Sequence, residues 1–203
     1  MKPSDFNYFA SEEKALLRYL AEVRTRLARP FCRLCTALGC TPDILSLAGL
    51  LALAPFVFLA VWGMHWWAIA CIVVSQFLDG LDGPLARYQR VDDVSGSLTD
   101  MVCDQTGLAV VVCTLIYAGL AEGALGALYL YLYTMMVIFL VLRNVLRCPY
   151  RYVLRSRYMV FFAYLLYAAS GINLLNPVLI LCSLYMLVVV LRGFIVLRRS
   201  LKA

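Results

Sequence analysis

The sequence has 203 residues, of which 64% are hydrophobic and 15% are charged, and its formal net charge is +6. This composition is too apolar for a water-soluble domain, whose surface must be largely polar, so that class is excluded. The ten-residue alternation typical of a membrane β-barrel is absent from the sequence pattern, so the chain is expected to cross the bilayer as helices.

The first predicted element is an amphipathic helix over residues 11–29. Apolar side chains recur there at helical spacing, with basic and acidic side chains on the opposite face. The apolar positions are Leu16, Leu20, Val23 and Leu27. Such a helix either lies on the membrane surface or packs as a solvated helix on the rest of the protein, and we expect the interfacial arrangement.

Six apolar runs follow, and each is read as a transmembrane helix that extends into its bordering polar residues. The runs are residues 44–62, 66–78, 107–120, 124–142, 158–169 and 175–196. Thr41 and Pro42 are predicted as the N-cap and first residue of the first of these helices. The expected fold is an all-α integral membrane protein with six transmembrane helices after an interfacial helix. Residues 1–203 are expected to form one domain, with a cytoplasmic or interfacial segment at about 1–40 and a six-helix bundle at about 41–200.

The basic residues predict the orientation, because they gather on the cytoplasmic side of membrane proteins. With six crossings and both termini inside, all 18 Lys and Arg residues fall on one side of the membrane. The connections on the other side, around His65, Glu122 and Asn173, hold none. We therefore expect a protein of the cell membrane with cytoplasmic termini, whose positive charge requires no nucleic acid.

Two pairs of aspartates lie beside the predicted connection between the second and third helices. Asp79 and Asp82 are three residues apart, and Asp100 and Asp104 are four apart, so each pair shares one helix face. The four carboxylates should meet near the cytoplasmic boundary, where their mutual repulsion requires cations. Oxygen ligands without histidine or cysteine favour magnesium, manganese or calcium.

Glycines and an arginine accompany the carboxylates. Gly83 and Gly96 allow the backbone to approach a bulky ligand, and Arg87 can bind a phosphate through two hydrogen bonds. Carboxylates for paired metals, together with these residues, indicate phosphoryl transfer from a nucleotide-activated donor.

The pattern Asp79-x-x-Asp82-Gly83-x-x-Ala86-Arg87, then eight residues, then Gly96-x-x-x-Asp100-x-x-x-Asp104 resembles the signature of the CDP-alcohol phosphotransferase family. The six predicted spans and the preceding surface helix extend the similarity over nearly the whole chain. The resemblance implies transfer of a substituted phosphate from a CDP-linked donor to an alcohol, with release of CMP, two divalent metals (Mg²⁺ or Mn²⁺) and a homodimer.

The resemblance also implies a role for each matching residue. The metal ligands would be Asp79, Asp82, Asp100 and Asp104. Asp104 would in addition accept the proton of the attacking hydroxyl, as a catalytic base. The nucleotide would lie against Asp82, Gly83, Ala86, Arg87 and Gly96. The implied donor is CDP-diacylglycerol, whose acyl chains can stay in the lipid bilayer.

The acceptor alcohol is indicated less clearly. Arg143, Arg147 and Arg192 could bind an acceptor that carries a phosphate, such as glycerol 3-phosphate or inositol phosphate, or could serve only to set topology. Pro149 prevents the arginines that follow the fourth span from being assigned to one helix. The doubled "DGLDGPLAR" is similar to phosphatidylcholine synthases, which keeps choline or another unphosphorylated amino-alcohol as an alternative acceptor.

A different functional class is an intramembrane divalent-cation carrier that uses the same aspartates as a transport site. A carrier explains the carboxylates but leaves Gly83, Arg87 and Gly96 without a role. We therefore favour an enzyme that transfers a phosphatidyl group from CDP-diacylglycerol to a phosphorylated polyol.

Overall fold

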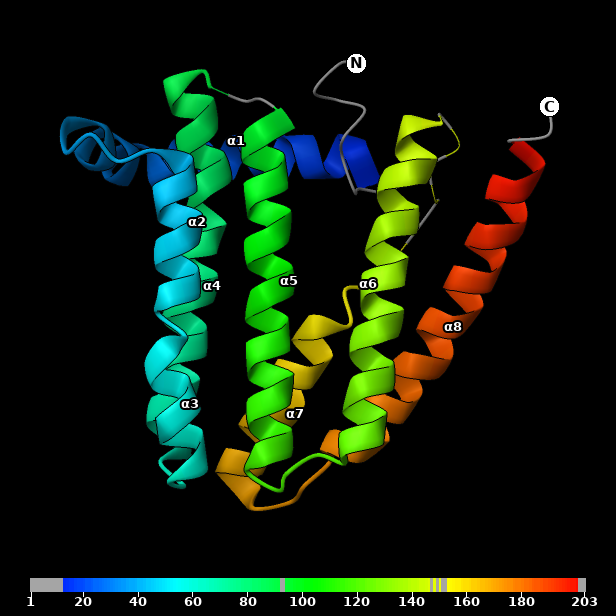
Figure 1. Cartoon of the computed structure of the whole chain (residues 1–203). Coiled ribbons are helices and arrows are strands. Elements are labelled where there is room, and N and C mark those ends of the chain that lie inside the picture. The colour runs from blue at the N-terminus through cyan, green and yellow to red at the C-terminus, as the bar shows by residue number, and fades with distance from the viewer. Residues whose placement is uncertain (1–12, 92–93, 147, 149, 151–152, 201–203) are drawn as a thin grey trace.

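The computed structural model describes residues 13–91, 94–146, 148, 150 and 153–200 (Figure 1). Within these residues the chain forms helices and no strands. The helices are α1 (Glu13–Ala37), α2 (Pro42–Leu51), α3 (Ala54–Val61), α4 (His65–Gln89), α5 (Val94–Tyr117), α6 (Gly123–Val145), α7 (Arg157–Ser170) and α8 (Leu175–Ser200). The predicted all-α class is confirmed.

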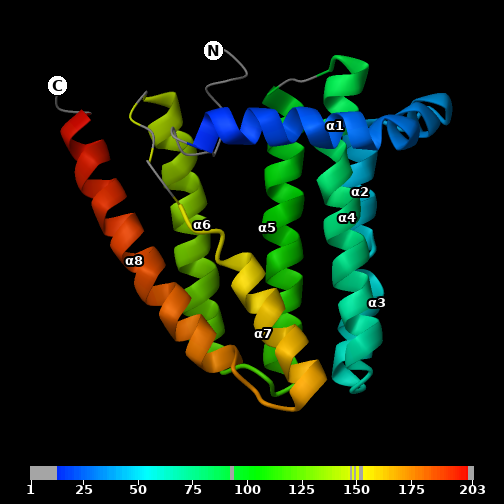
Figure 2. The same ribbon diagram turned by 180° about the vertical axis from the view of Figure 1, so that it is seen from behind.

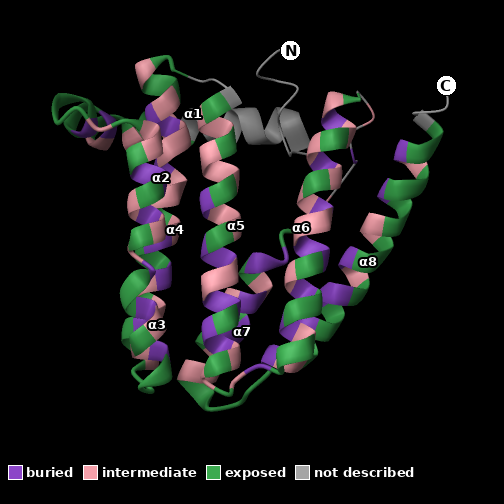
Figure 3. Ribbon diagram, viewed as in Figure 1, coloured by how far each residue is buried: buried purple, intermediate pink, exposed green. Residues whose placement is uncertain are grey.

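Five helical stretches of the described chain are long and apolar enough to cross a membrane. They are Pro42–Val61, His65–Gln89, Ser95–Tyr117, Gly123–Val145 and Leu175–Arg199. Exposed residues cover the outward sides of these helices (Figure 3), and they include large apolar side chains such as Phe58, Phe77 and Leu184. Apolar surface of this extent is suited to lipid, so the protein is membrane-embedded.

The first pass consists of α2 and α3, with a break at Ala52 and Leu53, where one continuous helix is predicted. Pro55 lacks the N–H that would bond to the carbonyl of Leu51, and this interrupts the helical ladder. The predicted start of the pass is confirmed. Thr41 is the N-cap, its hydroxyl accepts the N–H of Ile44 at 3.3 Å, and Pro42 is the first helical residue.

Helix α1 lies across one end of the bundle, roughly perpendicular to the other helices (Figures 1 and 2). We refer to this end as the α1 end. The helix continues to Ala37, beyond the predicted limit, although it contains Pro30. Its last turns are held by Cys32 and Cys35, which are buried against α2 and α4. Leu27 and Leu34 are exposed, and the interfacial position of α1 stays a prediction.

The pass between α6 and α8 differs from its prediction. Helix α7 has 14 residues, which at 1.5 Å per residue is too short for the hydrocarbon thickness. It occupies the part of the bundle farther from α1 (Figure 2). The residues before it are not helical, and the backbone N–H of Leu154 donates to the hydroxyl of Tyr185 at 2.8 Å. Irregular backbone is tolerated at this depth because protein groups satisfy it. As a consequence, Arg157 begins α7 inside the bundle and does not lie in a connecting loop.

Candidate metal and nucleotide site

Helix α4 carries Asp79 and Asp82 in its last three turns, at the α1 end. The hydroxyl of Ser46 in α2 donates to Oδ2 of Asp82 at 2.6 Å, and the N–H of Gly83 donates to Oδ1. Close packing makes the first of these bonds possible. A Cβ on Gly49 would lie 3.2 Å from the carbonyl oxygen of Ser75, so a larger residue would push α2 and α4 apart by a few tenths of an ångström, and glycine favours this close approach.

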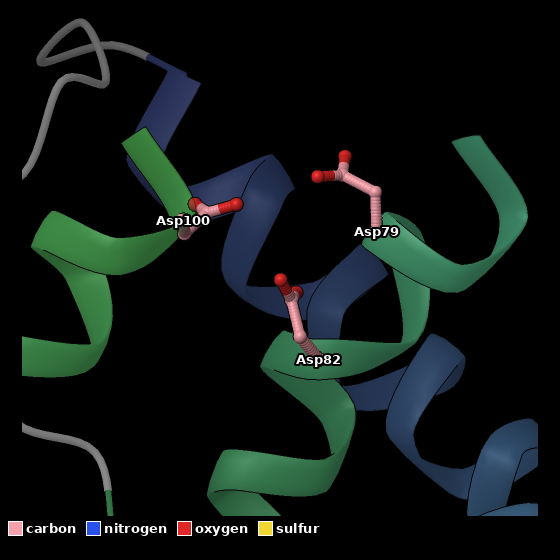
Figure 4. A group of neighbouring side chains, drawn as sticks. All are labelled: Asp79, Asp82 and Asp100. Atoms are coloured by element: carbon pink, nitrogen blue, oxygen red, sulfur yellow. The ribbon is translucent and has the colours of Figure 1, made fainter. Parts of the chain in front are cut away.

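Helix α5 adds a third carboxylate. Ligand oxygens of Asp79, Asp82 and Asp100 all lie within 4.8 Å of one another. Figure 4 shows the three side chains converging from α4 and α5 on a shared space. Three half-buried carboxylates at this separation suit a hard divalent cation, which would bring the charge that they need. The chemistry of the donors therefore fits the predicted metal type.

Asp104, the fourth predicted ligand, has a different partner. Its Oδ1 forms an ion pair with Nη1 of Arg157, and Nη2 of the same arginine lies 3.7 Å from Oδ2 of Asp79. Arg157 is only 7% exposed, and its Nη2 also donates to the hydroxyl of Tyr158 at 3.1 Å. A buried guanidinium thus neutralises the part of the cluster that faces α7, where ion pairing is least screened.

A cavity lies directly beside these groups, between α2, α4, α5 and α7. Polar side chains line it next to the aspartates, and apolar ones line the remainder. The polar lining residues are Ser46, Ser75, Gln76, Asp79, Asp104 and Arg157. The metal-ligand candidates thus border an internal space that continues away from their cluster.

The residues predicted to hold a nucleotide lie at the α1 end. Gly83, Ala86 and Arg87 follow Asp82 in the last turns of α4, and Gly96 is in the first turn of α5. Arg87 is exposed, and its Nε donates to the hydroxyl of Thr25 in α1 at 3.0 Å. A Cβ on Gly83 would lie 3.4 Å from Nη1 of Arg87, so the guanidinium crosses the backbone there. All four residues are on the two helices that bear the aspartates.

The predicted acceptor arginines are spread over other elements. Arg143 lies in the last turn of α6, where its Nε donates to the carbonyl of Cys148 at 2.7 Å and its guanidinium lies 3.8 Å from the ring centre of Tyr150. Arg192 is exposed on α8. Arg147 lies outside the described residues. Each pair of aspartates lies on one helix, whereas these arginines lie on different elements. The helical repeat therefore cannot bring the arginines to the aspartates.

Two residues at the site were missed by the sequence prediction. Arg157 is predicted only as a cytoplasmic loop residue that sets topology, yet it contacts two of the aspartates. Its position immediately before an apolar run was only a weak signal, because an arginine at the end of a membrane helix commonly reaches the head groups. Ser46 carried no comparable signal, since a serine in an apolar helix usually bonds to its own backbone.

Comparisons with known proteins relate this chain to enzymes that transfer phosphate-containing groups. The sequence profile of the family described as CDP-alcohol phosphatidyltransferase matches residues 40–201. A phosphatidylinositol phosphate synthase of Mycolicibacterium smegmatis (strain ATCC 700084 / mc(2)155) is 38% identical over 85 residues. That alignment covers 40% of this chain and 37% of the relative, so the chain spans well under two thirds of the relative's length.

Proposed function

Because this chain belongs to the CDP-alcohol phosphatidyltransferase family, and is thus a transferase of phosphate-containing groups, we propose its donor, acceptor and residue roles. The donor is CDP-diacylglycerol, and the acceptor is the hydroxyl of a small polar alcohol. The products are a phospholipid and CMP. The observation that carries this proposal is the convergence of Asp79, Asp82 and Asp100, on the same two helices that carry Arg87, Gly83 and Gly96.

Asp79, Asp82, Asp100 and Asp104 are the residues that would hold two divalent cations, Mg²⁺ or Mn²⁺. When bound, these ions supply positive charge that neutralises the diphosphate and the leaving CMP. The bonds from Ser46 and from the N–H of Gly83 support this role, because they fix the carboxylate of Asp82 before any ligand arrives.

Asp104 is the catalytic base in this proposal. The acceptor hydroxyl oxygen attacks the phosphorus that carries diacylglycerol, the new P–O bond forms, and the P–O bond to CMP breaks. Arg157 holds Oδ1 of Asp104, so we assign the proton of the hydroxyl to Oδ2. Arg157 also keeps the carboxylate in one orientation. A catalytic base needs this, because it must stay within hydrogen-bond reach of the acceptor hydroxyl.

The cytidine diphosphate part of the donor binds at the end of α4 and the start of α5, against Asp82, Gly83, Ala86, Arg87 and Gly96. Arg87 provides the positive charge and the paired N–H donors that suit a phosphate. The neighbouring helices expose apolar side chains to lipid. The acyl chains of the donor can therefore stay in the bilayer beside these helices while its head group enters the site.

The acceptor in this proposal is a phosphorylated polyol, such as glycerol 3-phosphate or inositol phosphate. Arg157 supports it, because a buried guanidinium beside Asp104 suits an anionic acceptor and disfavours the cation choline. Arg143, Arg147 and Arg192 remain predicted acceptor residues. The relative from M. smegmatis, named for a phosphatidylinositol phosphate product, agrees with this chemistry.

The test is CMP release by the purified protein with CDP-diacylglycerol, Mg²⁺ or Mn²⁺, and a panel of alcohols. We expect CMP with glycerol 3-phosphate or inositol phosphate, and little with choline or free inositol. Turnover with choline alone would replace the acceptor with an amino-alcohol. Absence of CMP with every acceptor, together with metal flux in liposomes, would instead support a divalent-cation carrier.

We further propose one membrane-embedded domain over the whole chain, acting as a homodimer in the cell membrane. The segregation of basic residues along the sequence, Arg157 excepted, supports cytoplasmic termini and a cytoplasmic site. Protease protection in oriented vesicles tests the orientation, and mass measurement in nanodiscs tests the dimer.

A further inference from the structure

The surface helix α1 contacts α4 at the turns that carry the aspartate and nucleotide residues. Figure 4 shows α1 passing behind the cluster of Asp79, Asp82 and Asp100, and Figure 2 shows the same helix crossing α4. The hydroxyl of Thr25 accepts a hydrogen bond from Nε of Arg87 at 3.0 Å. This bond joins residues that are 62 positions apart in the sequence.

A second contact lies one residue earlier on α1. A Cβ on Gly80 would lie 2.5 Å from Nη2 of Arg24, so the guanidinium of Arg24 rests directly on the α4 backbone between two metal-ligand candidates. Arg87 itself crosses the backbone at Gly83. Arg87 is therefore placed between its own helix on one side and α1 on the other.

The end of α1 is also tied to α4. The side-chain amide of Gln89 donates to the hydroxyl of Thr36 at 3.1 Å and to the carbonyl of Cys40 at 2.9 Å. Cys32 and Cys35 are buried in the same interface. These contacts hold α1 in register with α4, so the position of Thr25 follows from how the whole helix is docked.

We propose that Thr25 is a positioning residue that holds Arg87 ready for the diphosphate of the donor, which couples the docking of α1 to nucleotide affinity. This inference rests on the proposed function, in which Arg87 binds the nucleotide. An exposed arginine loses much rotamer freedom when it binds a phosphate, and a partner that restricts it beforehand reduces that loss.

The experiment measures CDP binding to the full-length protein in nanodiscs with Mn²⁺, by calorimetry, beside steady-state kinetics. Thr25→Val and Thr25→Ala both remove the hydroxyl, and the second does so without a branched side chain. Each should raise the Kd for CDP and the KM for CDP-diacylglycerol about fivefold, with kcat changed by less than about twofold. Thr25→Ser keeps the hydroxyl and should restore both values.

The matched control is Thr36→Val, which removes a hydroxyl from the same helix and a bond to α4, but not the bond to Arg87. Gln89 keeps its bond to the carbonyl of Cys40, and Cys32 and Cys35 keep their buried contacts, so α1 stays docked and the CDP affinity should stay near the wild-type value. An equal rise in Kd for Thr36→Val, or unchanged affinity in both Thr25 variants, would overturn the inference. A wild-type protein that does not bind CDP at all would instead reject the proposed function, so the two failures are distinguishable.

Discussion

Two regions of the molecule differ in how their charged side chains are arranged. Helices α4 and α5 carry the carboxylates in pairs on one helix face, whereas the arginines of α6 to α8 are spread over separate helices. On α4 and α5, each pair of carboxylates shares one helix face, and three of the four carboxylates meet within 4.8 Å. Arg143, Arg157 and Arg192 come from three different helices, and Arg157 forms ion pairs with Asp104 and Asp79.

The difference shows that a site can be specified by local sequence spacing or by the packing of separate helices. Spacing of three or four residues sets the relation of two side chains on one helix before any tertiary contact forms. Charges on separate helices are brought together only by packing, and here the short α7 carries Arg157 to the site. Substitutions at six positions test how far this contrast extends to function.

The largest effect is expected for Asp79→Asn, which breaks the acidic cluster itself. Loss of one carboxylate should weaken Mn²⁺ binding and lower kcat/KM by about 1,000-fold, or about 4 kcal/mol. Mn²⁺ titration by electron paramagnetic resonance measures the affinity. As a control, Glu122→Gln at the opposite end of the bundle should leave Mn²⁺ affinity unchanged; similar losses in both variants would contradict a metal role for Asp79.

Asp104→Asn separates the metal role from the base role. It should lower kcat by about 100-fold or more, because proton transfer contributes on this scale, while CDP affinity stays near that of the wild type. Single-turnover kinetics and CDP calorimetry provide the two measurements. If turnover and nucleotide binding fell together, Asp104 would be only a ligand.

Arg157→Gln tests the link between the two regions. Removal of the guanidinium leaves Asp104 without the cation that holds its Oδ1, and kcat/KM for a phosphorylated acceptor should fall by about 10- to 100-fold. Mn²⁺ affinity should not fall, in contrast to Asp79→Asn. Arg157→Lys keeps the charge without the planar fork and should recover part of the activity; a full recovery with unchanged acceptor KM would show that only charge balance is needed.

Ser46→Ala probes support for the acidic cluster from α2. Loss of the 2.6 Å bond to Asp82 should weaken Mn²⁺ binding by about tenfold, with little change in thermal stability. Ser46→Thr retains the hydroxyl and serves as the matched control. Wild-type affinity in the alanine variant would show that the N–H of Gly83 is sufficient to orient Asp82.

The smallest effect is expected for the arginines farther from the aspartates. Arg143→Ala should raise the acceptor KM by about threefold, and Arg192→Ala by less, because an exposed charge is screened by salt. Initial rates over a range of acceptor concentration are the measurement. Unchanged kinetics in both variants would remove these two residues from the acceptor site.

Much of this fold was predictable from local pattern. The six apolar runs lie in α2–α3, α4, α5, α6, α7 and α8, Thr41 and Pro42 begin the first pass as predicted, and the aspartates occupy the expected turns of α4 and α5. Two predictions were wrong, one because of a proline in the first pass and one because a short helix begins inside the bundle. Pro55 splits the first pass, and α7 is too short to keep Arg157 outside the bundle.

The sequence by itself determined the helical class, the segregation of basic residues and the pairing of aspartates along each helix, because these follow from composition and from the 3.6-residue period. Only the tertiary structure decided which groups complete the site. Ser46 reaches Asp82 across 36 residues of chain, and Arg157 pairs with Asp104 from a different helix. Such contacts depend on how helices pack, and no local spacing specifies them.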